Sequence, residues 1–218
     1  MAGKAALIVG NGERPSPELF AACQAEADLV LCADGGINTA AAYGCKPDYI
    51  VGDFDSAAPD QLAGEQVERV DADNTGTDAQ KVLRVALRLG VERVVMLGFT
   101  GGRTDHTLWN LSLLKTFGDQ LDLRLVDDYC EIRLIGKRLR FRADVGQLLS
   151  LCPLSGPVEG IVTSGLRFPL RDEALIPGQR DGISNEVVAN LVEISVQRGD
   201  LLLCVQRQSA SGKIEVLS

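Results

Sequence analysis

Short apolar runs alternate with helical stretches through the first half of the chain, and this alternation constrains the fold more than any other feature. The pattern is typical of βα units and a mostly parallel sheet. Strands are predicted at Ala5–Val9, Leu29–Ala33, Tyr49–Val51, Val67–Val70, Arg93–Leu97 and Leu123–Val126. The first half is therefore expected to be an α/β domain with a Rossmann-like, mostly parallel sheet and flanking helices.

Four helices are predicted between these strands. Ser16 can cap the first helix, and Pro17 suits its first position. Thr77 and Gln80 fit a capping box, and apolar residues then recur at helical spacing until Gly90. The other two helices are expected after Gly35-Gly36 and from Thr104 to Phe117.

The second half changes to a pattern of period two. Residues 192–196 alternate apolar and polar side chains, and the apolar run 201–205 follows a turn. Such runs, separated by Gly, Pro and Asp, predict an antiparallel β-sandwich without a convincing helix. We therefore expect two domains, residues 1–128 and 129–218.

Composition excludes several classes of function. The chain has 218 residues and a formal net charge of -8, which argues against broad binding to nucleic acid or to an anionic membrane. Its six cysteines show neither a C-x-x-C pair nor the spacing of a zinc site, so reduced thiols are expected. The N-terminal apolar run is too short for a signal peptide or a membrane span, and a cytoplasmic protein is predicted.

Aspartates recur where predicted strands give way to turns or helix starts. Ligands of open α/β sheets usually bind outside the carboxyl ends of the strands, so these carboxyl groups are expected to gather there. Magnesium prefers carboxylates, waters and phosphate oxygens, and the segments therefore predict a magnesium-phosphate site. The aspartates concerned are Asp34, Asp53, Asp55, Asp78 and Asp105.

Four of these five aspartates also have a purely structural interpretation. Asp53 and Asp55 can share a cation because they are two positions apart, but both can equally bond backbone amides in a turn. Asp34 before Gly35-Gly36 can bring the backbone close to a ribose or phosphate, or can simply form a strand-to-helix turn. Asp78 suits a helix start without any ligand.

Residues 101–106, Gly-Gly-Arg-Thr-Asp-His, combine a flexible turn, a guanidinium and a helix start. Backbone amides and the planar Arg103 fork could hold a phosphate there, although the segment is neither a Walker A loop nor a G-x-G-x-x-G motif. His106 is the only histidine, so a Ser-His-Asp triad is poorly supported. A capping or polar-contact role is the commoner fate of such a residue.

Two features stand out in the second half. Arg138, Arg140 and Arg142 alternate with apolar residues, which predicts a solvated strand face. Residues 163–170 and 182–186 pair an aromatic side chain with compact hydrogen-bonding groups, so they could line a pocket for a flat heterocycle.

Taken together and in this order, these motifs resemble the thiamine pyrophosphokinase family. The most specific stretches are residues 47–56, Pro-Asp-Tyr-Ile-Val-Gly-Asp-Phe-Asp-Ser, and residues 101–106. Residues 165–170, Gly-Leu-Arg-Phe-Pro-Leu, and 183–186, Ile-Ser-Asn-Glu, extend the resemblance over nearly the whole chain.

The resemblance implies a homodimer whose active sites lie between the α/β domain of one subunit and the sandwich of its partner. It also implies a reaction in which ATP and thiamine give AMP and thiamine diphosphate with Mg2+. The sequence departs from the family in having Phe168 where many members carry Trp or Tyr, and Lys81 matches only some members.

The roles implied for individual residues follow the motif matches. Asp53, Asp55 and Asp78 would hold Mg2+ with the ATP phosphates, and Arg103 and Asp105 would belong to the same catalytic cluster. The nucleotide site would comprise Asp34, Gly35, Gly36, Lys81, Arg103, Thr104 and His106. Thiamine would contact Phe168, Ser184 and Asn185.

Two other functions remain open on the residues alone. Paired aspartates also suit a magnesium-dependent phosphohydrolase, in which the metal activates water. The chain could also be a nucleotide-sensing module whose β domain binds a partner and whose α/β domain no longer catalyses.

Overall fold

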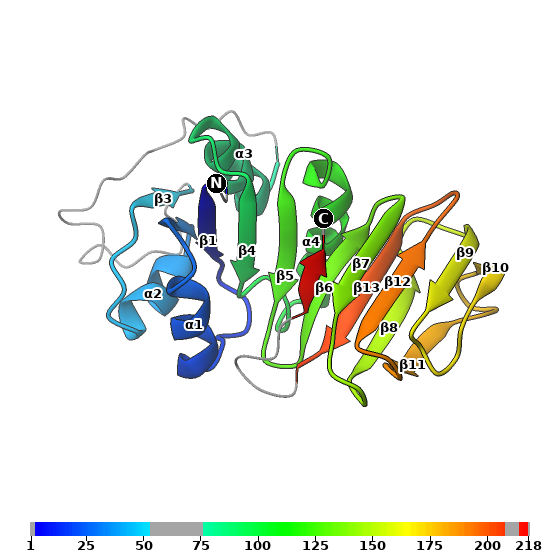
Figure 1. The fold of residues 1–218 in the computed structure, drawn as a ribbon. Helices are drawn as coiled ribbons and strands as arrows, with labels where there is room; N and C mark the ends of the chain where they lie inside the picture. The colour runs from blue at the N-terminus through cyan, green and yellow to red at the C-terminus, as the bar shows by residue number, and fades with distance from the viewer. Residues whose placement is uncertain (1–2, 53–75, 208–213, 218) are drawn as a thin grey trace. The chain divides into compact units, whose positions relative to one another are not determined.

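The computed structural model describes residues 3–52, 76–207 and 214–217, which form two compact units, 1–128 and 129–218. The predicted strand Val67–Val70 lies outside the described residues, as do Asp53 and Asp55. No helix in the described ranges is long and apolar enough to cross a membrane. Figure 1 shows the elements along the chain.

The elements of the first unit alternate as the sequence predicts. They are β1 Ala5–Val9, α1 Pro17–Gln24, β2 Leu29–Ala33, α2 Gly36–Ala42, β3 Tyr49–Val51, α3 Asp78–Arg88, β4 Arg93–Leu97, α4 Thr104–Phe117 and β5 Asp122–Val126. The strands lie in the order β3-β2-β1-β4-β5, and each neighbouring pair is parallel. The predicted Rossmann-like α/β fold is confirmed.

Local sequence explains where the helices begin. Ser16 caps α1 by accepting a hydrogen bond from the Leu19 amide, and Pro17 takes the first helical position. Thr77 and Gln80 form the predicted capping box at the start of α3, with both reciprocal bonds present. These signals set the helix starts at the carboxyl edge of the sheet.

The sheet of the first unit is buried on both faces, as a parallel sheet requires. On one face, Leu7, Val9 and Cys32 pack in a core with residues of α1 and α2. Ala6 and Ile8 alternate with Leu7 and Val9 along β1, so they lie on the other face, and they are buried as well. Helices α3 and α4 contact one another, α3 contacts β2 and α4 contacts β5. The strand ends are therefore held firmly, and the loops after them are free to form a site.

The second unit is an antiparallel β-sandwich. Its strands are β6 Cys130–Ile135, β7 Arg138–Arg142, β8 Leu148–Pro153, β9 Val158–Ser164, β10 Arg171–Leu175, β11 Gly182–Glu186, β12 Leu191–Ser195, β13 Leu201–Gln206 and β14 Glu215–Leu217. One sheet has the order β11-β8-β13-β6 and the other β10-β9-β12-β7-β14. No helix occurs in the described part of this unit, which agrees with the predicted sandwich.

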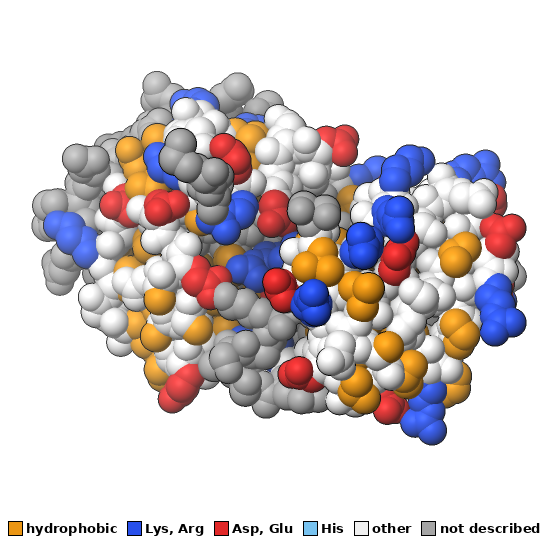
Figure 2. All heavy atoms as spheres, viewed as in Figure 1, with side chains coloured by type: hydrophobic (Ala, Val, Ile, Leu, Met, Phe, Trp, Pro, Cys, Tyr) orange, Lys and Arg blue, Asp and Glu red, His pale blue; other side chains and the backbone are white. Residues whose placement is uncertain are grey.

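The core of the sandwich lies between the inner faces of its two sheets. Leu151 and Leu203 project from one sheet, and Phe141 and Ile194 project from the other, all with at most 1% exposure. This alternation follows from the period of two in the sequence. The outer face of β7 carries the three predicted arginines, and Figure 2 shows acidic and basic side chains beside one another over β7 and β12.

Those arginines pair with acids rather than forming a free basic patch. Arg138 forms an ion pair with Glu193, and Arg142 Nε lies 3.6 Å from a carboxylate oxygen of Glu215. Both arginine side chains are more than half exposed, so the pairs contribute little stability. The prediction of a solvated strand face is confirmed.

Candidate functional site

The carboxyl edge of the parallel sheet has its switch point between β1 and β4. The chain passes from β1 to β2 and β3 on one side, and then returns to β4 on the other side of β1. The strand order therefore reverses between β1 and β4, which is where open α/β sheets bind their ligands.

Backbone bonds join the loops after β1 and β4. The Gly10 amide donates to the Leu97 carbonyl over 2.8 Å, and the Gly12 amide donates to the Gly98 carbonyl over 2.7 Å. A Cβ atom on either Gly10 or Gly12 would lie 2.6 Å from the Gly98 oxygen, so no side chain fits. Sequence reasoning missed these two glycines, although a Gly-x-Gly after the first strand was a usable signal.

Asp34 lies at the end of β2 in a strained and enclosed position. Its φ of 40° is in the left-handed region, and its amide donates to the Val51 carbonyl over 2.8 Å. The residue is 9% exposed, and its Oδ1 atom has no hydrogen-bond partner among the residues that the structure describes. A buried polar atom of this kind is costly unless a ligand satisfies it.

The glycines after Asp34 allow the chain to turn closely against the loop after β1. A Cβ atom on Gly36 would lie 2.0 Å from the Val9 carbonyl oxygen, and one on Gly35 would lie 2.5 Å from Asn11 Nδ2. The contact with the Val9 backbone leaves no room for a side chain on Gly36, whereas a side chain on Gly35 would require Asn11 to move. The backbone at Gly35-Gly36 therefore lies close to the chain's own residues at and after the end of β1. The predicted approach to a ribose or phosphate stays a prediction.

Asp78 and Lys81 lie on the first turn of α3. The Lys81 Nζ atom is 2.8 Å from Asp78 Oδ1, and the lysine side chain is only 12% exposed. One carboxylate oxygen of Asp78 is thus already paired. Asp78 is the only predicted metal ligand within the described ranges, and those ranges contain no group of three or more His, Cys, Asp or Glu side chains placed to hold a metal.

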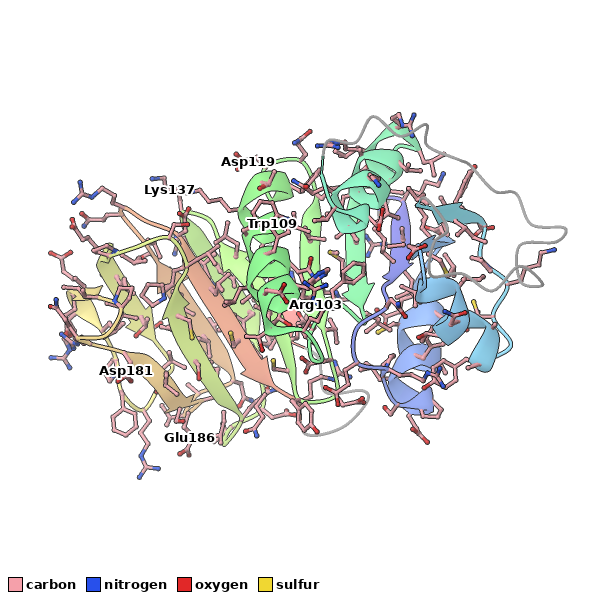
Figure 3. All side chains as sticks on the ribbon, turned by 180° about the vertical axis from the view of Figure 1, so that it is seen from behind. Arg103, Trp109, Asp119, Lys137, Asp181 and Glu186 are labelled. Atoms are coloured by element: carbon pink, nitrogen blue, oxygen red, sulfur yellow. The ribbon has the colours of Figure 1, made fainter. Side chains whose placement is uncertain are left out.

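Arg103 and Asp105 pair with each other at the start of α4, where Figure 3 labels the arginine. Nε and Nη2 of Arg103 lie 3.1 and 2.5 Å from the two Asp105 oxygens, in a two-point fork. Hydrogen bonding to Arg103, helped by the His106 amide, lowers the pKa of Asp105 to about 2. Asp105 is thus ionised at neutral pH and poorly suited to act as a base.

Thr104 and His106 are exposed beside this pair. Two hydrogen bonds hold the loop that precedes them. The hydroxyl group of buried Thr100 donates to Asp127 Oδ2 over 2.8 Å, and Asn110 Nδ2 donates to the Phe99 carbonyl over 2.8 Å. Sequence reasoning missed these anchors. Asp127 follows β5 directly, so an acid at a strand end was again the available signal.

The second unit contains a pocket of about 290 Å³. Its most exposed apolar side chains are Phe168 and Ile183, each 62% exposed. Asn185 also lines it, so the structure brings together two of the three residues predicted to contact the substrate. The complete lining is Leu151, Phe168, Pro169, Leu170, Arg180, Asp181, Gly182, Ile183 and Asn185.

Ser184 is exposed but does not line this pocket. Its φ is 57°, and its amide donates to Ser150 Oγ over 3.1 Å. Because a left-handed residue turns the chain, Ser184 separates the exposed Ile183 from the buried Asn185. In the described geometry, Ser184 therefore turns the backbone rather than lining the pocket.

The charged groups at the wall of the pocket have a surplus of negative charge. Arg180 forms an ion pair with Glu173, whose pKa is lowered first by the Arg171 amide and then by Arg180. Asp181, labelled in Figure 3 near the start of β11, accepts a hydrogen bond from the Ile183 amide over 3.1 Å. The arginine charge is therefore offset, whereas Asp181 adds a negative charge.

Two family models match the chain in the order of its two units. The model described as "Thiamin pyrophosphokinase, catalytic domain" matches residues 20–126, and "Thiamin pyrophosphokinase, vitamin B1 binding domain" matches residues 137–201. The chain belongs to the thiamine pyrophosphokinase family. Asp34, Asp78 and Arg103 lie in the part matched by the catalytic model, and the pocket residues Leu151 to Asn185 lie in the part matched by the vitamin B1 binding model.

Similar proteins agree with this assignment over most of their length. Thiamine pyrophosphokinase 1 of Arabidopsis thaliana is 30% identical over 215 residues, covering 84% of this chain and 79% of that protein. Thiamine pyrophosphokinase of Bacillus subtilis is 26% identical over 205 residues, covering 90% and 95%. The crystal structure of the thiamine pyrophosphokinase from Bacillus subtilis superposes with a TM-score of 0.81 at 25% identity, covering 94% of this chain and all of that one.

Proposed function

We propose that this protein transfers a pyrophosphoryl group from ATP to the hydroxyl group of thiamine, giving thiamine diphosphate and AMP. The observation that carries the proposal is the match of a catalytic and a vitamin B1 binding model in one chain, in the order of its two units. Chemistry at the two sites supports it, because one presents groups for a nucleotide and the other an apolar pocket.

The reaction requires the thiamine oxygen to attack the β-phosphorus while the bond to the AMP oxygen breaks and the hydroxyl proton leaves. Alignment and neutralisation of charge are then the main tasks of the protein. Arg103 presents its guanidinium at the start of α4, and Lys81 presents its ammonium on α3; both can hold phosphate oxygens. No dedicated base is assigned, because the pKa of Asp105 is about 2.

Asp34 supports nucleotide binding through its unsatisfied atom. The buried Oδ1 accepts no hydrogen bond within the described ranges, so a ribose hydroxyl or a hydrated cation would satisfy it. Gly35 and Gly36 keep the backbone beside it free of side chains. Thr104 and His106 are exposed next to Arg103 and complete the proposed nucleotide contacts.

The metal would be Mg2+, held by Asp53, Asp55 and Asp78 together with the ATP phosphates. Carboxyl oxygens are the ligands that this hard cation prefers, and the second oxygen of Asp78 is not used by Lys81. When bound, the metal supplies positive charge to the phosphate oxygens. Asp78 fits such a cation, since it offers this oxygen donor at the carboxyl edge of the sheet.

Thiamine would occupy the pocket of the second unit. Its flat rings suit the exposed Phe168 ring, and its thiazolium charge suits a wall in which Asp181 is negative and Arg180 is offset by Glu173. A homodimer with active sites at the subunit interface is inferred from the resemblance to the family. Exposed Phe168 and Ile183 are consistent with further cover from a partner subunit.

We place the enzyme in the cytoplasm. All six of its cysteines lie in the described ranges and none forms a disulfide there, as expected in a reducing compartment. Neither nucleic acid nor a membrane is proposed as a partner, since the net charge is -8.

The decisive test incubates the purified protein with ATP, Mg2+ and thiamine. AMP and thiamine diphosphate should form in equal amounts, and neither should form without thiamine. Release of ADP with thiamine monophosphate would contradict pyrophosphoryl transfer. Phosphate release without thiamine would favour the phosphohydrolase, and ATP binding without turnover would favour the nucleotide sensor.

A further inference from the structure

The pocket of the second unit is bordered by two segments that run side by side. The Arg167 amide donates to the Glu186 carbonyl, and the Val188 amide donates to the Gly165 carbonyl, both over 2.8 Å. Between their side chains, Arg167 Nη1 lies 2.8 Å from Glu186 Oε2. Segment 165–168 is therefore held along segment 185–188.

Asn185 closes this arrangement next to the aromatic ring. Its Oδ1 atom accepts from the Phe168 amide over 3.0 Å and from the Glu186 amide over 2.9 Å. Its Nδ2 atom donates to the Phe168 carbonyl over 2.8 Å. One side chain thus holds both the amide and the carbonyl of Phe168.

These bonds leave Asn185 little capacity to bind a ligand. An asparagine oxygen has two acceptor positions, and both are used by backbone amides. One of its two N–H groups is also used, and the residue is only 5% exposed. Phe168 shows the opposite balance, because its backbone is held while the residue is 62% exposed.

A local irregularity in β11 directs Asn185 inward. The pairing of β11 with β8 shifts register between Gly182 and Asn185, and Ser184 between them has a φ of 57°. Bulges of this kind re-aim side chains, often beside binding sites. The strand therefore gives up regular pairing at the point where Asn185 meets the Phe168 backbone.

We propose that Asn185 is a positioning residue, which fixes the Phe168 ring at the pocket and acts on the substrate only through that ring. The identity of the substrate rests on the proposed function, whereas the two-point hold on Phe168 does not. The resemblance to the family implied instead a direct contact between Asn185 and thiamine.

The proposal predicts a specific kinetic pattern. Replacing Asn185 by Ala would free the Phe168 backbone and leave its amide and carbonyl without these partners. The KM and Kd for thiamine should rise roughly tenfold, because ordering the ring then opposes binding. The kcat at saturating thiamine and the Kd for ATP should stay within about twofold, since no group near the phosphates is altered.

A double-mutant cycle separates positioning from direct contact. The thiamine Kd would be measured by calorimetry for the wild type, Asn185→Ala, Phe168→Ala and the double variant. If Asn185 acts only through the ring, the double variant should lie within about twofold of Phe168→Ala alone. Effects that multiply would overturn the proposal, because they would show that Asn185 contacts thiamine independently.

Asn185→Asp provides the second cycle where the alanine variant does not fold. It keeps the acceptor oxygen and the volume of the side chain, but it replaces the donor to the Phe168 carbonyl by an oxygen. Glu186→Gln is the matched control, because it weakens the ion pair with Arg167 and keeps the backbone bond; its thiamine Kd should change less than about twofold.

The wild-type measurement distinguishes the two possible failures. A wild type that neither binds nor converts thiamine would contradict the proposed function. A wild type that binds thiamine, combined with multiplying effects in either cycle, would contradict only the positioning role of Asn185.

Discussion

The two candidate sites satisfy their polar groups in opposite ways. At the carboxyl edge of the first unit, Asp34 keeps a buried oxygen without a partner in the described ranges, and Arg103 and Asp105 are exposed. In the pocket of the second unit, Asn185 is bonded on both ends while the apolar Phe168 ring is exposed. The first site is therefore suited to gain hydrogen bonds from a ligand, and the second to gain apolar contact.

Because of this difference, the polar group that binds the ligand in the first unit lowers the stability of the fold, whereas the polar group at the pocket of the second unit raises it. A group that is unsatisfied without its ligand costs stability until the ligand arrives. A group that is satisfied internally stabilises the fold and shapes the pocket at once. Substitutions at the two sites should consequently change melting temperature and affinity in different combinations.

The largest effect is expected for Asp53→Asn or Asp55→Asn. Each change removes one proposed ligand charge of Mg2+ while retaining the shape of the side chain. The kcat should fall by about 100-fold or more, with little change in melting temperature. Near-normal turnover in both variants would show that these aspartates have only a structural role.

Gly36→Ala tests how closely the carboxyl edge is packed. The new Cβ atom would lie 2.0 Å from the Val9 carbonyl oxygen, so the strand or helix must shift. Stability should fall by about 3 kcal/mol and the melting temperature by about 5–10 °C, despite the better helix propensity of Ala. Gly136→Ala is the control, because a Cβ atom there meets nothing within 4 Å; equal losses in both variants would contradict the packing argument.

Asp34→Asn tests the separation of stability from function. Asparagine tolerates the left-handed backbone and replaces the enclosed carboxylate by a neutral amide, which is less costly to bury, so the melting temperature without ligand should stay the same or rise. The Kd for ATP should nevertheless increase roughly tenfold, because the group that accepts from the nucleotide is weakened. If Asp34→Asn lowered both the melting temperature and the affinity for ATP, the two sites would not differ in the way argued above, because a joint loss of stability and affinity is what we expect for Asn185→Ala.

Asp181→Asn tests the negative wall of the pocket. The Kd for thiamine should rise by about threefold at low salt and by less at high salt, because the charge is exposed. Cys152 offers an independent readout, since its pKa is lowered to about 7 by a hydrogen bond with Cys204 and is raised in part by Asp181. The variant should therefore lower this pKa further and speed alkylation of Cys152 at pH 6.5; an unchanged rate would place the charge too far away.

The smallest effect concerns the pH profile and Asp105. The folded pKa of Asp105 is about 2, which lies below the ordinary value of 3.8. The hydrogen bond from Arg103 therefore stabilises the folded state above pH 3.8, and this stabilisation is lost as the pH falls through about 2. Between pH 5 and 9 the group does not titrate. Asp105→Asn should leave both limbs of the kcat profile in place, and a shifted acidic limb would show that Asp105 acts as the base.

Most of the fold could be predicted because its signals are local. The ranges Ala5–Val9, Leu29–Ala33 and Arg93–Leu97 are strands with the predicted bounds, and the capping box at Thr77 begins α3 as expected. The last strand of the unit, Asp122–Val126, starts one residue earlier than predicted. Apolar runs and caps depend on nearby residues, so the sequence alone carries them.

The site could be predicted only in part, because its decisive contacts join distant residues. The bonds from Gly10 to Leu97 and from Gly12 to Gly98 depend on the order of the strands, which no local pattern specifies. The hold of Asn185 on Phe168 depends equally on a sequence separation of 17 residues. The functional segments could thus be identified from the sequence, whereas the role of each residue within them became clear only from the structure.

The pairing of the loops after β1 and β4 also limits how this protein can evolve. The Gly10 and Gly12 amides bond residues 97 and 98, so a residue inserted into either loop would displace the bonds of the other. The bonded parts of the two loops, residues 10–13 and 97–100, can therefore change in length only together. Insertions and deletions among relatives should accumulate elsewhere, and a chain with an insertion in one of these loops should carry a compensating change in the other.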